Sequence, residues 1–427
     1  MARGRKPKKA KQAELPLEAE SKQEKPKKQK ARFDFESSLV LFKYMLSLFD
    51  ADSLETLCSG MKDINLEGWD EEGISRFYRH LTNRTVPFSG VTNDDLLRYD
   101  NNIASHTREI VRRRPDFRWK YFQYMAILFT EVYLDRYFSG RERLAGDLNS
   151  FLEENINSRI PDGSKLKPYT EEDLNKIAFW QATGSGKTLL MHVNILQYKY
   201  YHSKAAGQKG INKTILLTPN EGLSNQHKGE FELSGMQADL FSKDSTGLFG
   251  GKFIEIIDIH KLKEQGKEKT VSLEAFEGDN LVLVDEGHRG AGGEEWMKNR
   301  DKLCEDGFSF EYSATFGQAM KASGKPEMLE EYAKCIIFDY SYKYFYGDGY
   351  GKEYSILNLA EKSYDDKTQE YMAACLLTFY QQLKYFNENK ADTIKFNIEK
   401  PLWVFVGKTV NKGTKESGVQ ITDVIRI

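Results

Sequence analysis

Three runs of consecutive apolar residues interrupt an otherwise mixed chain, and a polar side chain follows each of them. They occupy residues 177–180, 215–217 and 281–284. Runs this short and wholly apolar are typical of parallel strands buried on both faces of a sheet. Residues 308–312 alternate aromatic and polar side chains and predict a further strand, whereas 189–201 predicts a helix. The pattern indicates an α/β fold with a parallel sheet flanked by helices.

The first of these strands leads into a loop that is suited to bind phosphate. Its residues are Ala182, Thr183, Gly184, Ser185, Gly186, Lys187 and Thr188. Glycines let backbone N–H groups close around a triphosphate, and the N-terminus of the following helix points at the anion. Lys187 would reach the outer phosphates and the Thr188 hydroxyl would face magnesium. The loop therefore predicts binding of ATP and Mg²⁺, although Gln181 stands where the general pattern has its first glycine.

Two carboxylates, Asp285 and Glu286, directly follow the apolar run at 281–284. Asp285 is placed to hold magnesium through its water shell, and Glu286 to orient and polarise the attacking water. An Asp-Glu pair after a strand also occurs in ordinary solvated loops. Here the pair lies on a second core strand, 98 positions after Lys187, and this order favours the catalytic interpretation.

Two hydroxyl side chains, Ser313 and Thr315, follow the alternating strand at 308–312. Open α/β sheets bind ligands along the edge formed by the carboxyl ends of their strands. A Ser-Ala-Thr triplet alone is more typical of a turn or a helix cap. Its position after the other two motifs is what assigns it to the site.

Together these segments resemble the motifs of superfamily-two helicases and translocases. Residues 182–188 match the first motif, 285–288 the second and 313–315 the third. Residues 218–220, Thr-Pro-Asn, look like the family's DNA-contacting motif between the first and the second, and 253–262 resembles the segment after it. The resemblance implies a RecA-like P-loop sheet and a DNA-dependent ATPase.

Within the superfamily, residues 285–316 and 340–352 are most similar to the ATPase (Res) subunit of type III restriction enzymes, and the resemblance extends over residues 100–427. This group implies a role in restriction of phage or foreign DNA, with a methyltransferase (modification) subunit as a partner. Thr218 and Pro219 would lie along the backbone of single- or double-stranded DNA, and contacts to phosphate would give little sequence preference.

The resemblance also assigns roles to further residues. His288 would couple the nucleotide site to the nucleic-acid site, and Ser313 and Thr315 would relay that coupling. Gln123 lies where relatives place a glutamine that reads the adenine edge, although its distance of 63 positions from Gly186 is longer than in many of them. The alternative for Gln123 is a polar residue on a helix at 122–137.

Large apolar residues recur at every second position over residues 336–344: Ile336 is followed by four aromatic residues, at 338, 340, 342 and 344. Exposed aromatic side chains of this kind stack on nucleic-acid bases in some proteins. The strict alternation instead favours a strand with one buried face.

The motifs, together with Pro- and Gly-containing turns, divide the chain into successive parts. A basic tail is followed by a helical N-terminal region, the first RecA-like ATPase lobe with an insertion at about 138–169, a connecting segment, and the start of a second RecA-like lobe. The corresponding ranges are 1–33, 34–115, 116–335, 336–400 and 401–427. The expected second lobe begins with an apolar strand at 401–407 and holds too few residues to form a sheet.

Composition narrows the class of protein. The chain has 427 residues, of which 40% are hydrophobic, enough to bury a large core. No apolar run reaches the length of a membrane span, and the four cysteines are isolated in the sequence. We therefore expect a cytoplasmic protein that has no membrane partner, no disulfide framework and no metal beyond nucleotide-bound Mg²⁺.

The net charge of −2 conceals a basic N-terminus. Residues 1–32 contain 12 Lys or Arg and 4 Glu, so the remainder of the chain carries −10. Such a tail is expected to be disordered and to bind nucleic acid or an acidic partner weakly, or to act only as a solubilising segment.

The sequence is compatible with more than one activity for the chain on its own. The family's later motifs, including the arginines that stabilise transition-state charge, would lie beyond residue 427, as would a nuclease. We therefore expect either an ATPase lobe that another chain completes with a second RecA-like lobe, or an inactive fragment or accessory subunit that binds nucleotide or DNA without turnover. A third alternative, a P-loop ATPase that acts on proteins, is disfavoured by the second and third motifs.

Overall fold

The computed structural model describes most of the chain and divides it into two compact units, Met1–Gly351 and Lys352–Ile427. The described residues are 34–207, 210–241, 253–259, 278–286, 300, 302–304, 307–351, 364–395 and 398–404. The basic tail at 1–33 and most of the expected second lobe, 405–427, lie outside them.

The first unit is built on one seven-stranded sheet in which every pairing is parallel. Its strands are β1 (Lys176–Gln181), β2 (Lys213–Thr218), β3 (Ala238–Leu240), β4 (Ile254–Asp258), β5 (Asn280–Asp285), β6 (Phe308–Ser313) and β7 (Ile336–Tyr340). Their order across the sheet is β3-β4-β2-β5-β6-β1-β7. The predicted α/β fold with a parallel sheet is confirmed.

The central strands are buried on both faces, as continuous apolar runs require. One expectation about this sheet is wrong. Over residues 336–344 the alternation predicts a strand with one buried face, but β7 ends at Tyr340 and all five of its residues are buried. The chain then turns into helix α12 (Tyr342–Gly347). Because β7 pairs with β1, the sheet continues past the boundary expected at residue 335.

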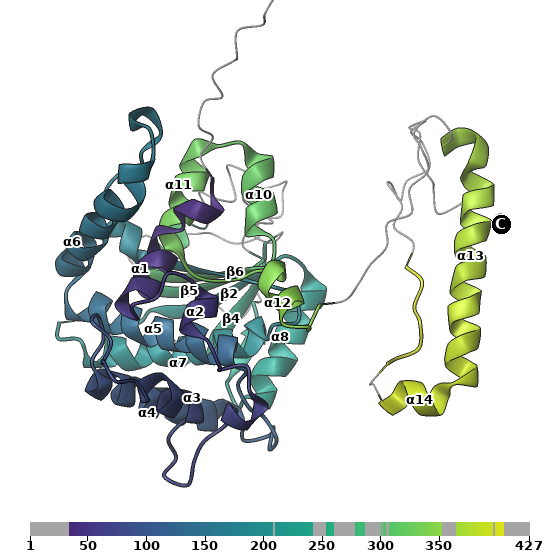
Figure 1. The fold of residues 1–427 in the computed structure, drawn as a ribbon, viewed down its shortest axis with the longest axis horizontal. Coiled ribbons are helices and arrows are strands. Elements are labelled where there is room, and N and C mark those ends of the chain that lie inside the picture. The colour runs from purple at the N-terminus through teal and green to yellow at the C-terminus, as the bar shows by residue number, and fades with distance from the viewer. Residues whose placement is uncertain are drawn as a thin grey trace, which may run out of the picture. The chain divides into compact units, whose positions relative to one another are not determined.

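Helices surround this sheet. The first unit contains α1 (Val40–Leu48), α2 (Leu54–Leu57), α3 (Arg76–Thr82), α4 (Asn93–Ile110), α5 (Tyr121–Ser139), α6 (Arg141–Phe151), α7 (Lys187–Lys204), α8 (Glu221–Leu233), α10 (Phe316–Ser323), α11 (Pro326–Cys335) and α12. In Figure 1, α10 and α11 lie above the sheet, α5 and α7 lie below it, and α3 and α4 form an outer layer. The N-terminal helices share one hydrophobic core with the strands, so they are an integral part of the unit.

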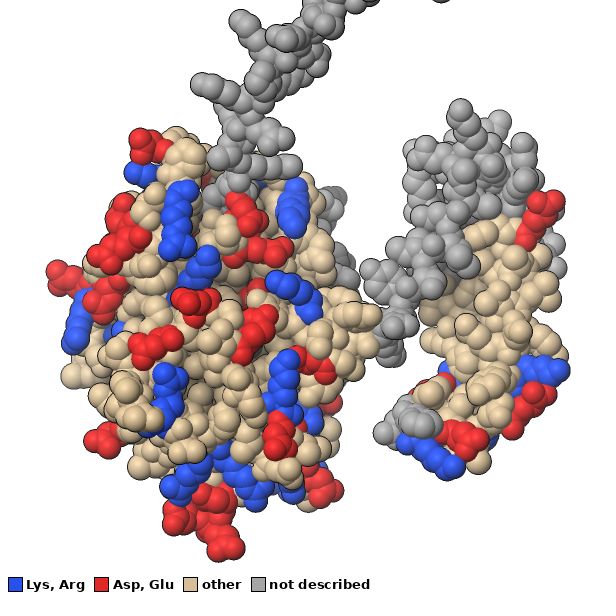
Figure 2. All heavy atoms as spheres, in the orientation of Figure 1, with Lys and Arg blue, Asp and Glu red and all other residues tan. Residues whose placement is uncertain are grey.

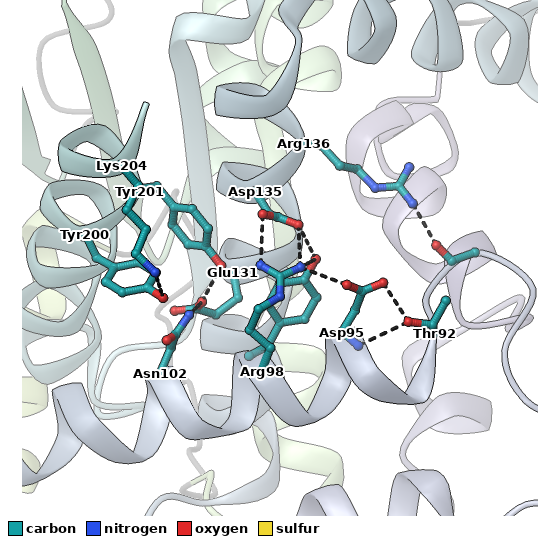
Figure 3. Close-up of polar contacts among 12 residues, drawn as sticks. Thr92, Asp95, Arg98, Asn102, Glu131, Asp135, Arg136, Tyr200, Tyr201 and Lys204 are labelled. Carbon is teal, nitrogen blue, oxygen red and sulfur yellow. Dashed lines mark hydrogen bonds and ion pairs between the residues drawn. The ribbon is translucent and has the colours of Figure 1, made fainter. Parts of the chain in front are cut away.

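A polar network joins the N-terminal helical layer to the helix next to the sheet (Figure 3). Arg98 on α4 donates from both terminal nitrogens to the Asp135 carboxylate on α5, at 3.1 and 2.9 Å. One turn away, the buried Glu131 accepts hydrogen bonds from Asn102 on α4 and from Tyr201 on α7. These contacts fix α4 on the α5–α7 pair.

The second unit contains α13 (Tyr364–Glu388) and α14 (Lys390–Lys395). Residues 401–404, where a strand was expected to begin, have no regular secondary structure. None of the helices in the described parts of the chain is long and apolar enough to cross a membrane.

Candidate nucleotide-binding site

The strand order gathers the sequence motifs at one edge of the sheet. Because all strands run in parallel, β5, β6 and β1 end side by side there. The register is close: Asp285 pairs with Tyr312, and Trp180 pairs with Ser313. The phosphate loop, the Asp-Glu pair and the Ser-Ala-Thr turn therefore emerge together at the carboxyl edge, where α/β sheets bind ligands.

The phosphate loop has the backbone that its glycines predict. Gly184 and Gly186 have φ values of 86° and 93°, in the left-handed region that favours glycine. The loop is closed by a hydrogen bond from the Ser185 N–H to the Ala182 carbonyl oxygen, at 3.2 Å. Helix α7 starts at Lys187, so Thr188 lies in its first turn and the N–H groups of that turn face the loop. This arrangement is suited to hold an anion.

Gln123 lies directly against this loop. Its Nε2 donates to the carbonyl oxygen of Ser185 at 2.7 Å, and its Oε1 accepts from the backbone N–H of Lys120 at 2.9 Å. A Cβ on Gly186 would lie 2.4 Å from the same Nε2, so a larger residue there would displace the Gln123 amide; the φ of 93° is what favours glycine at this position. A residue that is 62 positions away from Ser185 in sequence is thus a neighbour of the phosphate loop.

The carboxylates lie across from the loop lysine. The Lys187 ammonium is 3.8 Å from Oε1 of Glu286 and 3.4 Å from the carbonyl oxygen of Gln181. Glu286 has φ 55°, a left-handed conformation that is unusual for a side chain of its type. Strained residues of this kind concentrate at functional sites. Asp285, at the end of β5, is largely buried.

A residue that the sequence did not single out also belongs to this site. His227 on α8 places its Nε2 2.9 Å from Oδ2 of Asp285. Ser224, His227 and Phe231 form the buried face of α8, with the spacing expected of an amphipathic helix. That spacing alone does not distinguish a packing histidine from one that contacts the site, so the contact became evident only in the fold.

The third motif adopts the turn expected at this edge. Ser313 is fully buried at the end of β6, and its hydroxyl accepts a hydrogen bond from the Thr315 N–H at 3.0 Å. Thr315 precedes α10. His288, the expected coupling residue, lies outside the described residues.

The expected DNA-contacting turn follows β2. The side chains of Thr218 and Pro219 are buried and that of Asn220 is exposed. The Thr218 hydroxyl lies 2.6 Å from that of Ser224 on α8, so it points into the protein. At this turn the exposed side chain is therefore that of Asn220, and the Thr218 hydroxyl is not exposed.

The oxygen donors of the site fit a magnesium ion that is bound together with a nucleotide. Mg²⁺ takes one or two protein oxygens and completes its shell with water and phosphate. Thr188 and Asp285 are donors of this kind at the same edge. Among the described residues, no group of three or more His, Cys, Asp or Glu could hold a metal ion.

The fold and the site define a class of protein. A parallel sheet that carries a phosphate loop, an Asp-Glu pair and a Ser-Ala-Thr turn at one edge is the ATPase core of a superfamily-two helicase or translocase. Residues 148–318 match the model of the family described as "Type III restriction enzyme, res subunit" and form a domain of that family. The matched segment contains all three motifs. The resemblance to this family that the sequence indicated is confirmed.

The chain has low similarity to individual known proteins. No curated protein matches the chain. Among solved structures, the SWI2/SNF2 ATPase core of Sulfolobus solfataricus in complex with dsDNA is 13% identical with a TM-score of 0.27, over 36% of this chain and 31% of that one. The UvsW helicase from bacteriophage T4 is 16% identical with a TM-score of 0.27, over 39% of this chain and 55% of that one. The chain thus spans about a third and about half of their lengths.

Proposed function

We propose that the first unit is the ATP-binding and ATP-hydrolysing lobe of a DNA helicase or translocase that resembles the res subunit of type III restriction enzymes. The observation that supports this most directly is the placement of Lys187, Glu286 and Asp285 at one edge of the sheet beside a phosphate loop. The family match over residues 148–318 supports the reaction class.

Each residue of the site has a defined task in this proposal. Backbone N–H groups of the loop bind the phosphates, and the Lys187 ammonium offsets the charge that develops on the outer phosphate. Glu286 orients a water molecule and accepts its proton as the water attacks. Gln123 holds the loop through the Ser185 carbonyl group. Magnesium, held by Thr188 and Asp285, would neutralise phosphate charge when it binds with ATP.

The proposed nucleic-acid contact lies at the turn after β2, around Asn220. Lys and Arg are interspersed with Asp and Glu over the face drawn in Figure 2, without a continuous basic stripe among the described residues. We expect this contact to be made mainly to phosphates, with little sequence preference. Binding should weaken steeply with added salt, because counterions are released from the phosphates on binding. A strong preference for one short duplex sequence would contradict this part of the proposal.

The test is ATP binding and hydrolysis by the purified chain, with and without DNA, beside two lysine variants. Lys187→Ala should lose ATP binding, whereas Lys228→Ala should not, since Lys228 is a surface residue that pairs with Asp239. DNA-stimulated turnover that depends on Lys187 would support a working ATPase. Lysine-dependent binding without turnover would favour the alternative of a nucleotide-binding accessory chain. Absence of nucleotide binding in the folded wild-type chain would overturn the proposal.

A further inference from the structure

The contact between His227 and Asp285 joins two side chains that are almost completely buried. Their exposed fractions are 5% and 11%, and the Nε2–Oδ2 distance of 2.9 Å is that of a hydrogen bond. A buried carboxylate is stabilised when a donor is fixed on it. His227 is held in turn by the packing of α8, on whose buried face it lies.

The second nitrogen of the ring identifies the donor. Nδ1 of His227 is buried and has no hydrogen-bond partner among the described residues. If the proton of the neutral ring were on Nδ1, the lone pair of Nε2 would face the carboxylate oxygen and repel it. Nε2 therefore carries a proton and donates it to Oδ2 of Asp285. This hydrogen bond engages one carboxylate oxygen and fixes the plane of the carboxylate.

Helix α8 makes a second contact of the same kind one turn earlier. Ser224 shares a hydrogen bond with Thr218 at the end of β2, and β2 pairs with β5. The helix is capped by Asn220, whose Oδ1 accepts from the Leu223 N–H at 3.0 Å. One short helix therefore connects the turn at Asn220 with the carboxylate of Asp285.

From these contacts we infer that His227 is a positioning residue for magnesium: its Nε2–H orients the Asp285 carboxylate so that the other oxygen faces the bound ion. The inference rests on the proposed ATPase function and names a residue that none of the sequence motifs contains. Groups that orient a metal-binding side chain typically change metal affinity or activity by about 10- to 100-fold when they are removed.

The measurement is the affinity of a non-hydrolysable ATP analogue, by calorimetry, in EDTA and across a magnesium titration. His227→Leu removes the donor, and His227→Gln keeps an amide N–H at a similar reach. We expect His227→Leu to bind the analogue normally in EDTA but to need about 10-fold more Mg²⁺ for the magnesium-dependent gain in affinity. The magnesium dependence of His227→Gln should remain within about threefold of the wild type. Turnover should follow the same order.

The chain contains a matched control at the opposite end of the same strand. His202 lies 3.5 Å from Asp279, which precedes β5, and its side chain is also buried. His202→Leu should change thermal stability to a similar extent without altering the magnesium dependence. Equal shifts in His202→Leu and His227→Leu, or no shift in His227→Leu, would overturn the inference.

A second pair of variants covers the case in which His227→Leu is unfolded. If His227→Leu does not fold, His227→Gln is compared with His227→Asn, whose shorter amide falls short of Asp285. Equal magnesium dependence in these two would overturn the inference, and a selective loss in His227→Asn would support it. A wild-type chain that binds no nucleotide at all would instead refute the proposed function.

Discussion

The two edges of the sheet both carry buried charges, but they use them differently. At the amino edge, Lys176 and Arg300 each lie 3.0 Å from the fully buried Glu311, and Arg300 also lies 3.1 Å from Glu331. Although burial favours the neutral carboxyl, Lys176 and Arg300 hold the pKa of Glu331 at about 2. Each charge of this network has an opposite charge within hydrogen-bonding distance.

At the carboxyl edge, the ion pair beside the phosphate loop is longer. Lys187 and Glu286 are 3.8 Å apart, beyond a hydrogen bond. Nearby, the Gln181 amide and the Ser185 hydroxyl are buried without hydrogen-bond partners among the described residues. Buried polar groups are normally satisfied, and exceptions mark sites of strain or of ligand contact. The charges around Glu311 are thus satisfied within the protein, whereas the phosphate loop leaves polar groups that a ligand could satisfy.

The largest effect that we predict is on turnover, from a substitution at the carboxyl edge. Glu286→Gln keeps the shape of the side chain but removes the base, so ATP hydrolysis should fall by about 10²- to 10⁴-fold. Binding of ATP should be retained, and the free energy of unfolding should change by less than about 1 kcal/mol. Single-turnover kinetics and calorimetry measure the two quantities. An unchanged rate would show that Glu286 is not the base.

The matching substitution at the amino edge should act on stability alone. Glu311→Ala leaves Lys176 and Arg300 buried with one partner fewer, and breaking a buried ion pair in this way costs about 3–5 kcal/mol. Urea unfolding of the variant would measure the loss. The affinity for ATP below the unfolding transition should stay as in the wild type. A variant of normal stability would mean that the network contributes little.

A third, smaller effect is the pH dependence of stability that arises from Glu131, which is buried on helix α5. Burial raises the pKa of Glu131 to about 7 from 4.5, while Asn102, Tyr201 and Gln197 oppose the shift through hydrogen bonds. The folded state therefore holds the proton more tightly than the unfolded state. The stabilisation is complete below pH 4.5 and is lost as pH rises through about 7, for a change of roughly 3 kcal/mol.

Glu131→Gln isolates that contribution. The difference in unfolding free energy between wild type and variant should shift in favour of the variant as pH rises from about 4.5 to 8. Any constant offset reflects the altered hydrogen bonds in Figure 3 and does not depend on pH. A pH-independent difference would mean that the carboxyl is ionised throughout this range.

Much of the carboxyl edge could be predicted from the sequence, because β1, β2 and β5 are apolar runs that each end in a polar motif. The parallel sheet, the phosphate loop and the Asp-Glu pair all followed from that pattern. The amino edge could not be predicted, because Lys176 is more than 120 positions from both Arg300 and Glu311, and none of the three belongs to a motif. Contacts such as these depend on strand order and register, which a single sequence does not specify.

Two further features depend on tertiary contacts in the same way and could not be predicted. His227 lies on a helix face whose spacing requires only that its residues be buried, and its partner became known only when β2 and β5 paired. The strand expected over 336–344 failed because alternation cannot locate a strand end. After Tyr340 the alternating aromatic residues continue into α12, where Tyr342 and Tyr346 are exposed and Tyr344 is half-buried.

The smallest effect that we predict is a gain in stability when the backbone strain at Glu286 is relieved. Glu286 adopts φ 55°. This backbone conformation destabilises the folded state for any residue that has a Cβ, but not for glycine. Glu286→Gly should therefore raise the free energy of unfolding by about 0.5–1 kcal/mol while abolishing turnover. Thermal or urea unfolding beside Glu286→Gln, which keeps the strain, would measure the gain. If Glu286→Gly were less stable than Glu286→Gln, the strain would not be a cost of function. A gain would mean that the carboxyl edge retains a less stable conformation because the chemistry requires a carboxylate there.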